Sequence, residues 1–225
     1  MDAKDILPSI VTTSPDWPEK IREADELGIK EIALFPTFLK KDQRQPLYDL
    51  LAKSKIERIP FVHIRGDFDL AEMDFFTREW GTEVFNTHPF EPHPYISKYY
   101  KKIYLENVVK LFSEDELNRY AGVCIDFSHL RNDKILRPER FEAYQKAILS
   151  HPIGCNHIGG MREEKSFNEN ANEDRCDSHF LNDFSELDHL KSYPEQYFSK
   201  FVALEMENDL RTQLKAKEYI LNLRS

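Results

Sequence analysis

Short apolar runs alternate with longer amphipathic segments along the chain. The runs are rich in β-branched and aromatic residues and are too short for helices, which predicts buried strands. The segments between them carry the amphipathic pattern expected of surface helices. Eight strands are predicted in this way, at 5–11, 31–35, 58–64, 83–87, 102–106, within 122–130, at 153–158 and at 201–206.

Capping residues and helix breakers locate the helices between these strands. Ser14 is expected to cap a helix that begins at Pro15 or soon after and stops at Gly28, and Ser113 opens a Ser-x-x-Glu capping pattern. Further helices are predicted at 46–53, 69–80, 94–101, 137–149, 184–193 and 209–223. A long polar segment, from 161 to about 182, follows the seventh strand.

The regular alternation of strands and helices predicts an α/β fold. Eight strand–helix units in 225 residues match a (β/α)8 TIM barrel, with one domain over residues 1–225. A doubly wound open sheet is the alternative. No glycine-rich turn of the GxGxxG type opens any of the units, which disfavours that alternative.

Composition narrows the class of protein. Hydrophobic residues make up 40% and charged residues 32% of the chain, as in a globular protein. The formal net charge of -9 disfavours nonspecific binding of nucleic acid, although a local basic groove is compatible with it. Three cysteines without CxxC spacing argue against a disulfide framework or a zinc knuckle. Without a membrane-length apolar run or a signal-peptide core, a cytoplasmic location is expected, with no membrane partner.

Candidate metal ligands gather at the carboxyl ends of the predicted strands. The clearest case is 122–130, where an apolar strand ends in Asp126 and His129 is expected on the loop just beyond it. A buried carboxylate needs a counter-ion or a metal, and strand ends of a barrel converge on one face. Nine such residues are predicted to meet: His63, His88, Glu106, Asp126, His129, His157, Asp177, His179 and Glu205.

Each of these residues alone could be structural, but together they predict a site for divalent metal ions. Imidazole and carboxylate ligands suit zinc, which is the expected ion, with manganese or iron as alternatives. Three arginines that follow strands, Arg65, Arg131 and Arg162, could bind a substrate phosphate or be solvated. His93 could contact substrate or pack within its loop.

The remaining polar features are assigned to the surface. His151 and His189 are expected to be solvated. The stretch 162–175 has the composition of a mobile lid over the site or of a disordered surface loop, and both interpretations remain open.

Six segments, FNTHPF, YLEN, GVCIDFSH, CNHIGG, DSHF and ALEMEN, resemble in this order the xylose isomerase-like TIM barrel superfamily. The ligand set most resembles its endonuclease IV branch. That resemblance implies one ion held by His63, His88 and Glu106. It implies a second ion held by Asp126, His157, Glu205 and the bridging Glu106. The third would be held by His129, Asp177 and His179. The chain is shorter than typical members, and counterparts of their DNA-penetrating loops are not identifiable.

Two enzymatic activities are compatible with these ligands. The first is metal-assisted hydrolysis of a phosphoester, possibly of the endonuclease IV type, for which all three ions are needed. The second is isomerisation or epimerisation of a sugar or sugar phosphate with one divalent ion, in which Glu106 and Glu205 act as the acid–base pair. The third triad favours the hydrolase. A small phosphorylated or sugar substrate is expected, with DNA as a weaker alternative. A catalytically silent binding module is the least favoured interpretation.

Overall fold

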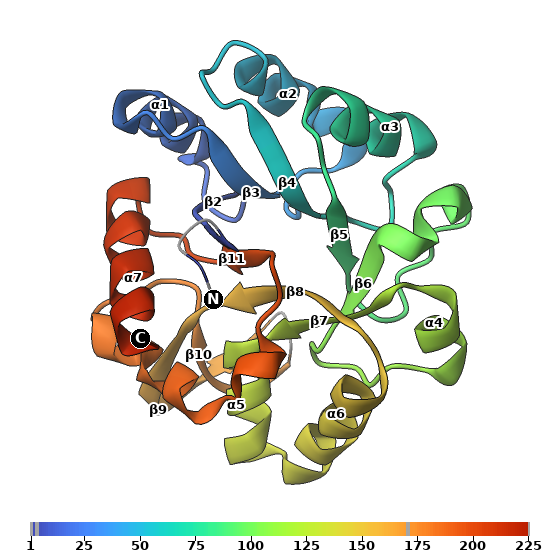
Figure 1. Cartoon of the computed structure of the whole chain (residues 1–225), viewed down its shortest axis with the longest axis vertical. Helices are drawn as coiled ribbons and strands as arrows, with labels where there is room; N and C mark the ends of the chain where they lie inside the picture. The colour runs from blue at the N-terminus through green and yellow to red at the C-terminus, as the bar shows by residue number, and fades with distance from the viewer. Residues whose placement is uncertain (1, 3–4, 170–171, 225) are drawn as a thin grey trace.

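Parallel strands form a ring at the centre of the molecule (Figure 1). The computed structural model describes residues 2, 5–169 and 172–224. In these residues nine strand segments form one sheet, in the order β1-β11-β8-β7-β6-β5-β4-β3-β2. The predicted first strand appears as β1 (Ile6–Leu7) and β2 (Ser9–Val11), on either side of Pro8, which has no N–H to donate. β1 pairs with β11 (Val202–Leu204) and β2 with β3 (Glu31–Phe35), so the two pieces close the barrel.

The other strands follow one another around the barrel in chain order. Each pairs in parallel with its neighbour, and nearly all their residues are buried, as expected for strands that are covered on both faces. Their bounds lie within about one residue of the sequence prediction, apart from the sixth, which was only placed within a longer stretch. They are β4 (Arg58–His63), β5 (Val84–Thr87), β6 (Ile103–Glu106), β7 (Gly122–Asp126) and β8 (Ile153–Ile158).

Helices surround the barrel, as predicted. They are α1 (Trp17–Leu27), α2 (Gln45–Leu51), α3 (Leu70–Glu79), α4 (Glu114–Arg119), α6 (Pro138–Ser150) and α7 (Leu210–Leu223). The capping box at Ser113 is confirmed, since its hydroxyl accepts from the amide of Glu116. The prediction for Ser14 is wrong: Asp16 precedes the first turn of α1 without a side-chain cap. Pro18, near the start of that turn, fixes the backbone without a capping side chain.

Some connections form short 3-10 helices where α-helices were predicted. The segments are η3 (Ser97–Lys102) and η4 (Phe184–Ser192), accompanied by η2 (Lys41–Gln43) and η5 (Glu195–Tyr197). Pro194 follows η4, so this segment cannot continue past its carboxyl end as an α-helix.

A helix that the sequence did not predict follows β7 without a loop. α5 (Phe127–Leu136) begins as the strand ends, and Asp126 is its N-cap, accepting from the amide of His129 at 2.7 Å. His129 therefore lies in the first turn of a helix, and its prediction on a loop is wrong. The physical reason is that α5 is buried on several sides, so it lacks the amphipathic pattern by which surface helices are recognised.

The polar segment after β8 forms an antiparallel hairpin. Its strands are β9 (Gly160–Asn168), which is exposed from Arg162 onward, and β10 (Glu173–Ser178), which is half-buried to buried. The polar segment from 161 to about 182 is therefore largely strand. The disordered-loop interpretation of 162–175 is corrected for the described residues, which exclude 170–171, and the mobile-lid interpretation stays a prediction. Both faces of β9 carry polar residues, so the sequence lacked the alternation by which strands are recognised.

Apolar side chains fill the barrel interior below the polar strand ends. Cys124 and Cys155 lie in this layer with Phe35, Phe61 and Ala203. Cys124, Cys155 and Cys176 are buried and free in the described structure. Within the described residues, no helix combines the length and apolarity needed to cross a membrane.

Candidate metal centre

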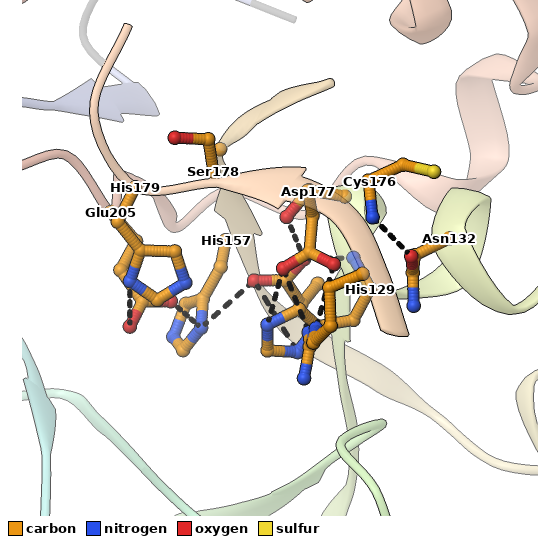
Figure 2. Close-up of polar contacts among 12 residues, drawn as sticks. His129, Asn132, His157, Cys176, Asp177, Ser178, His179 and Glu205 are labelled. Atoms are coloured by element: carbon orange, nitrogen blue, oxygen red, sulfur yellow. Dashed lines mark hydrogen bonds and ion pairs between the residues drawn. The ribbon is translucent and has the colours of Figure 1, made fainter. Parts of the chain in front are cut away.

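The nine predicted ligand residues converge at one end of the barrel. They fall into three groups in which one ligand atom from each residue lies within 4.8 Å of the others. Figure 2 shows His129, His157, Asp177, His179 and Glu205 pointing toward a common region. The strand group is His63, His88 and Glu106; the central group is Glu106, Asp126, His157 and Glu205; the hairpin group is His129, Asp177 and His179. The role of these residues as ligands stays a prediction.

The strand group joins two imidazoles to one carboxylate. His63 Nε2 lies 3.1 Å from His88 Nε2 and 3.1 Å from Glu106 Oε2. His63 Nδ1 lies 3.1 Å from the carbonyl of Ile64, which assigns the proton to Nδ1 and leaves the Nε2 lone pair facing the group. A backbone acceptor of this kind is the usual support for a metal-binding histidine.

The central group brings three carboxylates around one buried imidazole. His157 Nδ1 lies 3.0 Å from Glu205 Oε2, 3.3 Å from Glu106 Oε2 and 3.8 Å from Asp126 Oδ2. Asp126 Oδ2, Glu205 Oε2 and both ring nitrogens of His157 are buried without a hydrogen-bond partner among the described residues. Burial raises the pKa of Asp126, because its charged form is desolvated. Unpaired lone pairs and crowded carboxylates together fit a divalent cation.

Polar neighbours that the sequence prediction did not assign orient these ligands. Asn86 Nδ2 donates to Glu106 Oε2 at 2.8 Å. Asn107 holds the backbone of Asp126 from both sides, with its Nδ2 donating to the carbonyl at 3.0 Å and its Oδ1 accepting from the amide at 2.8 Å. Ser128 Oγ donates to Asp126 Oδ1 at 2.6 Å, so Oδ2 is the oxygen left facing the group. Asn86 lies in the segment FNTHPF and Asn107 in YLEN. Their places in these segments were the sequence signal that could have identified them.

The hairpin group is assembled from α5 and the end of the hairpin. His129 Nε2 lies 3.6 Å from Asp177 Oδ2, and the rings of His129 and His179 stack with centroids 5.9 Å apart. His129 Nδ1 is 3.4 Å from Glu106 Oε1, and His179 Nδ1 is 3.7 Å from Glu205 Oε1. Burial alone would lower the pKa of His129. Nearby negative charges, above all the carboxylate of Asp126, outweigh burial and raise this pKa to about 9. The two glutamates therefore connect the three groups.

Arg175 is a functional candidate that the sequence did not single out. Its guanidinium donates from Nε to Asp177 Oδ1 and from Nη2 to Oδ2, both at 2.8 Å, and it is only 6% exposed. A bidentate pair of this kind fixes the carboxylate plane. Arg175 lies within a run of polar residues that was assigned to the surface, so the sequence contained no signal for its burial.

An open cavity of about 720 Å³ lies over the three groups. Arg65 and Arg162, two of the three predicted phosphate-binding arginines, line it together with Arg175 and Lys110. Exposed aromatic rings also line the cavity: Phe38, Phe90 and Phe180. The walls thus offer cations for a phosphate and apolar rings for a less polar part of a ligand.

Arg131 and His93, for which substrate contact was one of two predicted roles, are not among the described residues that line this cavity. Arg131 lines a separate surface depression together with His189. His129 and Arg131 are two positions apart on α5, so their side chains point to nearly opposite sides of the helix, and His129 is the one that faces the site. His93 is 2% exposed, its Nε2 lies 2.8 Å from Thr87 Oγ1, and it is not among the described residues that line the cavity. Its contacts match the packing alternative.

The surface histidines also differ from expectation. His189 is half-buried where a solvated side chain was expected: its Nε2 donates to the carbonyl of Gly159 at 3.1 Å, and burial lowers its pKa to about 4. His151 is half-buried, and its Nδ1 lies 3.0 Å from the carbonyl of Ala147. The 3-10 segment η4 turns the ring of His189 inward against the loop that follows β8, which periodicity alone did not indicate.

No protein-family model and no curated protein matches the chain. Among solved structures, it is similar to a xylose isomerase-like TIM barrel protein from Mycobacterium smegmatis in complex with magnesium (13% identity, TM-score 0.48, 99% of this chain and 98% of that one). It is also similar to the probable 3-DHS dehydratase AsbF, involved in petrobactin synthesis, from Bacillus anthracis (11%, 0.47, 96% and 98%). A third structure is the IOLI protein with a bound zinc atom (13%, 0.45, 92% and 89%).

The first of these descriptions names the superfamily that the sequence resembles, and none of the three names the endonuclease IV branch. All three TM-scores are below 0.5.

Proposed function

We propose that this protein is a metal-dependent hydrolase of phosphoester bonds that holds three divalent ions in the strand, central and hairpin groups. The observation that supports this proposal is the hairpin group. One-ion chemistry requires only the central group, whereas His129, Asp177 and His179 form a separate set within 4.8 Å of one another. Two of its members are supplied by the hairpin and its end, and the third by α5.

Zinc is the ion that best fits these ligands, with manganese or iron as alternatives. The strand and hairpin groups each contain two imidazoles and one carboxylate, a mixture that suits zinc. Bound divalent ions would lower the pKa of a water molecule and neutralise phosphoryl oxygens. Asp126 Oδ2, His157 Nδ1 and Glu205 Oε2 are buried and make no hydrogen bond to a described residue, so a bound cation would contact these atoms.

The chain's own residues would position the substrate and the ions. Glu106 turns Oε2 toward the strand and central groups and Oε1 toward His129, so it sets the spacing of all three groups. Arg65 and Arg162 in the cavity wall can donate to a phosphate. Glu205 faces both His157 and His179, which makes it, with Glu106, the carboxylate best placed to exchange a proton with substrate or water.

A sugar or sugar-phosphate isomerase or epimerase is the second candidate function. The favouring observation is that the central group alone contains two glutamates and the most buried ligands, which would serve one ion and an acid–base pair. In this case the hairpin group would have no part in the reaction. The two candidates therefore differ in what they require of His129, Asp177 and His179.

The substrate we propose is a small phosphorylated molecule or sugar. A cavity of about 720 Å³ with arginines in its wall accommodates one. DNA of the kind cut by endonuclease IV is the weaker proposal, because the net charge of -9 opposes binding of a long phosphate backbone.

The deciding experiment measures metal content and turnover on the same preparation. We expect three zinc ions per chain by elemental analysis, one for each group. We also expect chelator-sensitive cleavage of p-nitrophenyl phosphate or bis(p-nitrophenyl) phosphate, with abasic-site duplex DNA tested in parallel. One ion per chain, no phosphoester cleavage and turnover of a ketose or ketose phosphate would instead establish the isomerase alternative.

A further inference from the structure

A cluster of ion pairs lies where the hairpin rests on α5 and α6, beside the metal centre. Its core is Arg140 of α6, which donates to two carboxylates at once. Nε and Nη2 donate to Asp133 of α5 at 2.8 and 2.5 Å, and Nη1 and Nη2 donate to Glu173 of β10 at 2.9 and 3.0 Å. Nη1 also donates to the carbonyl of Val109 at 2.8 Å. All five N–H bonds of this guanidinium are therefore used.

Arg137, at the start of α6, reinforces the same contact. Its Nη2 donates to the carbonyl of Asp174 at 2.6 Å, and its Nε lies 3.1 Å from Glu173 Oε2. The side chains of Arg140, Asp133 and Glu173 are only 15%, 2% and 12% exposed. At this degree of burial, removing one partner leaves an uncompensated charge, so the cluster constrains geometry more than a surface ion pair would.

The cluster is connected directly to the hairpin group. Asn132, next to Asp133 on α5, accepts from the amide of Cys176 at 2.8 Å (Figure 2). β10 is thus attached to α5 at Glu173 and again at Cys176, the residue before Asp177. Asn132 and Asp133 lie about one helical turn after His129. The turn of α5 that presents His129 is therefore followed by the turn that holds the strand carrying Asp177.

We propose that Arg140 is a positioning residue for the hairpin group: by holding Glu173 against Asp133, it fixes β10 on α5 so that Asp177 meets His129. This inference rests on the proposed three-ion function. Arg140 contacts none of the nine predicted ligands in the described structure, so it acts only through the placement of the hairpin. A merely stabilising ion pair would lower stability without selecting one of the three metal groups.

The test measures zinc binding by isothermal titration and elemental analysis in the wild-type chain and in Arg140→Gln. We expect three ions in the wild type, and in the variant an affinity for one of them weakened by about 10- to 100-fold, the usual effect of losing a ligand's outer support. Glu173→Gln removes the hairpin side of the cluster while keeping the Arg140–Asp133 pair, and we expect the same loss. The double variant should lose less than the sum of the two single losses, because both changes break the Arg140–Glu173 contact.

Arg44→Gln is the matched control. Arg44 is fully buried and bonds Glu72 through two nitrogens at 2.8 and 2.9 Å, but it lies beside α2 and α3, far along the chain from the hairpin. We expect a lower melting temperature and three retained ions. Loss of the same ion in Arg44→Gln would show that any buried arginine suffices and would overturn the inference.

The outcomes separate this inference from the proposed function. Fewer than three ions in the wild type would remove the three-ion function and the inference together. Three ions in the wild type with unchanged affinity in Arg140→Gln would overturn the inference alone. Should Arg140→Gln fail to fold, Glu173→Gln decides by the same criterion.

Discussion

The central and hairpin groups are both polar clusters at the same end of the barrel, but they are held in different ways. Asp126 and His157 lie at or near the ends of β7 and β8 and are register partners in the sheet. The hairpin group instead depends on side-chain bonds between α5, α6 and β10. A ladder of backbone hydrogen bonds is cooperative, whereas a few side-chain links can be broken one at a time. The central group should therefore tolerate changes outside it better than the hairpin group does.

The largest effect is expected from Glu106→Gln, because Glu106 contacts all three groups. Glu106→Gln removes a charged oxygen from the strand and central groups at once and the contact to His129 as well. We expect loss of at least two ions by elemental analysis and a fall in turnover well beyond the roughly 10- to 100-fold typical of an outer-support change. Glu114→Gln, an exposed change in α4, is the control and should keep both quantities. Near wild-type metal content in Glu106→Gln would contradict the shared role of this carboxylate.

The next change acts on the hairpin group alone. His129→Ala should reduce zinc from three ions to two while the central group stays filled, because Asp126 keeps its bonds to Ser128 and the backbone. Phosphoester turnover should fall by about 100-fold or more, since a metal ligand matters at least as much as its outer support. Unchanged metal content together with unchanged turnover of a sugar would favour the one-ion isomerase.

Acid is expected to destabilise the fold through His93, a residue outside both groups. His93 packs the loop after β5, on the strand side, and burial lowers its pKa to about 4. Its unfolded form has an ordinary pKa near 6.5, so the unfolded state binds the proton first as the pH falls. Above about pH 6.5 this difference has almost no effect, and between pH 7 and 5 we expect His93 to lower the free energy of unfolding by about 2 kcal/mol.

Urea unfolding at pH 7 and pH 5 measures this loss. His93→Gln keeps a polar group near Thr87 but cannot take up the proton, so its stability should change less between the two pH values. An equal pH dependence in wild type and His93→Gln would show that the proton is taken up elsewhere.

The smallest effects are expected from substitutions of two asparagines, one that supports the central group and one that supports the hairpin group. Asn107→Ala removes both bonds to the backbone of Asp126, and Asn132→Ala removes the bond to the amide of Cys176. Each variant should lose on the order of 1 kcal/mol per hydrogen bond in the free energy of unfolding. Zinc titration should show the weakened ion in a different group for each, the central group for Asn107→Ala and the hairpin group for Asn132→Ala. The same ion weakened in both variants would refute the distinction.

The barrel was predictable because its signals are local. Short apolar runs such as 153–158 have few alternatives to a buried strand, and the start of α4 follows from the capping box at Ser113. The helix α5 was not predictable in the same way, because burial on several sides removes the polar face that marks a surface helix. The hairpin was missed for the opposite reason, since polar residues lie on both of its faces.

The sequence by itself determined which residues could meet. Once a barrel is formed, the carboxyl ends of its strands share one face, so the positions of Glu106, Asp126 and His157 follow from their places in the chain. Only the tertiary structure decided what surrounds them: that Arg131 turns away, that Arg175 is buried on Asp177, and that Arg140 ties the hairpin to α5. These outcomes depend on which distant segments pack together, because an ion pair requires two side chains to be close and a linear pattern does not record that distance.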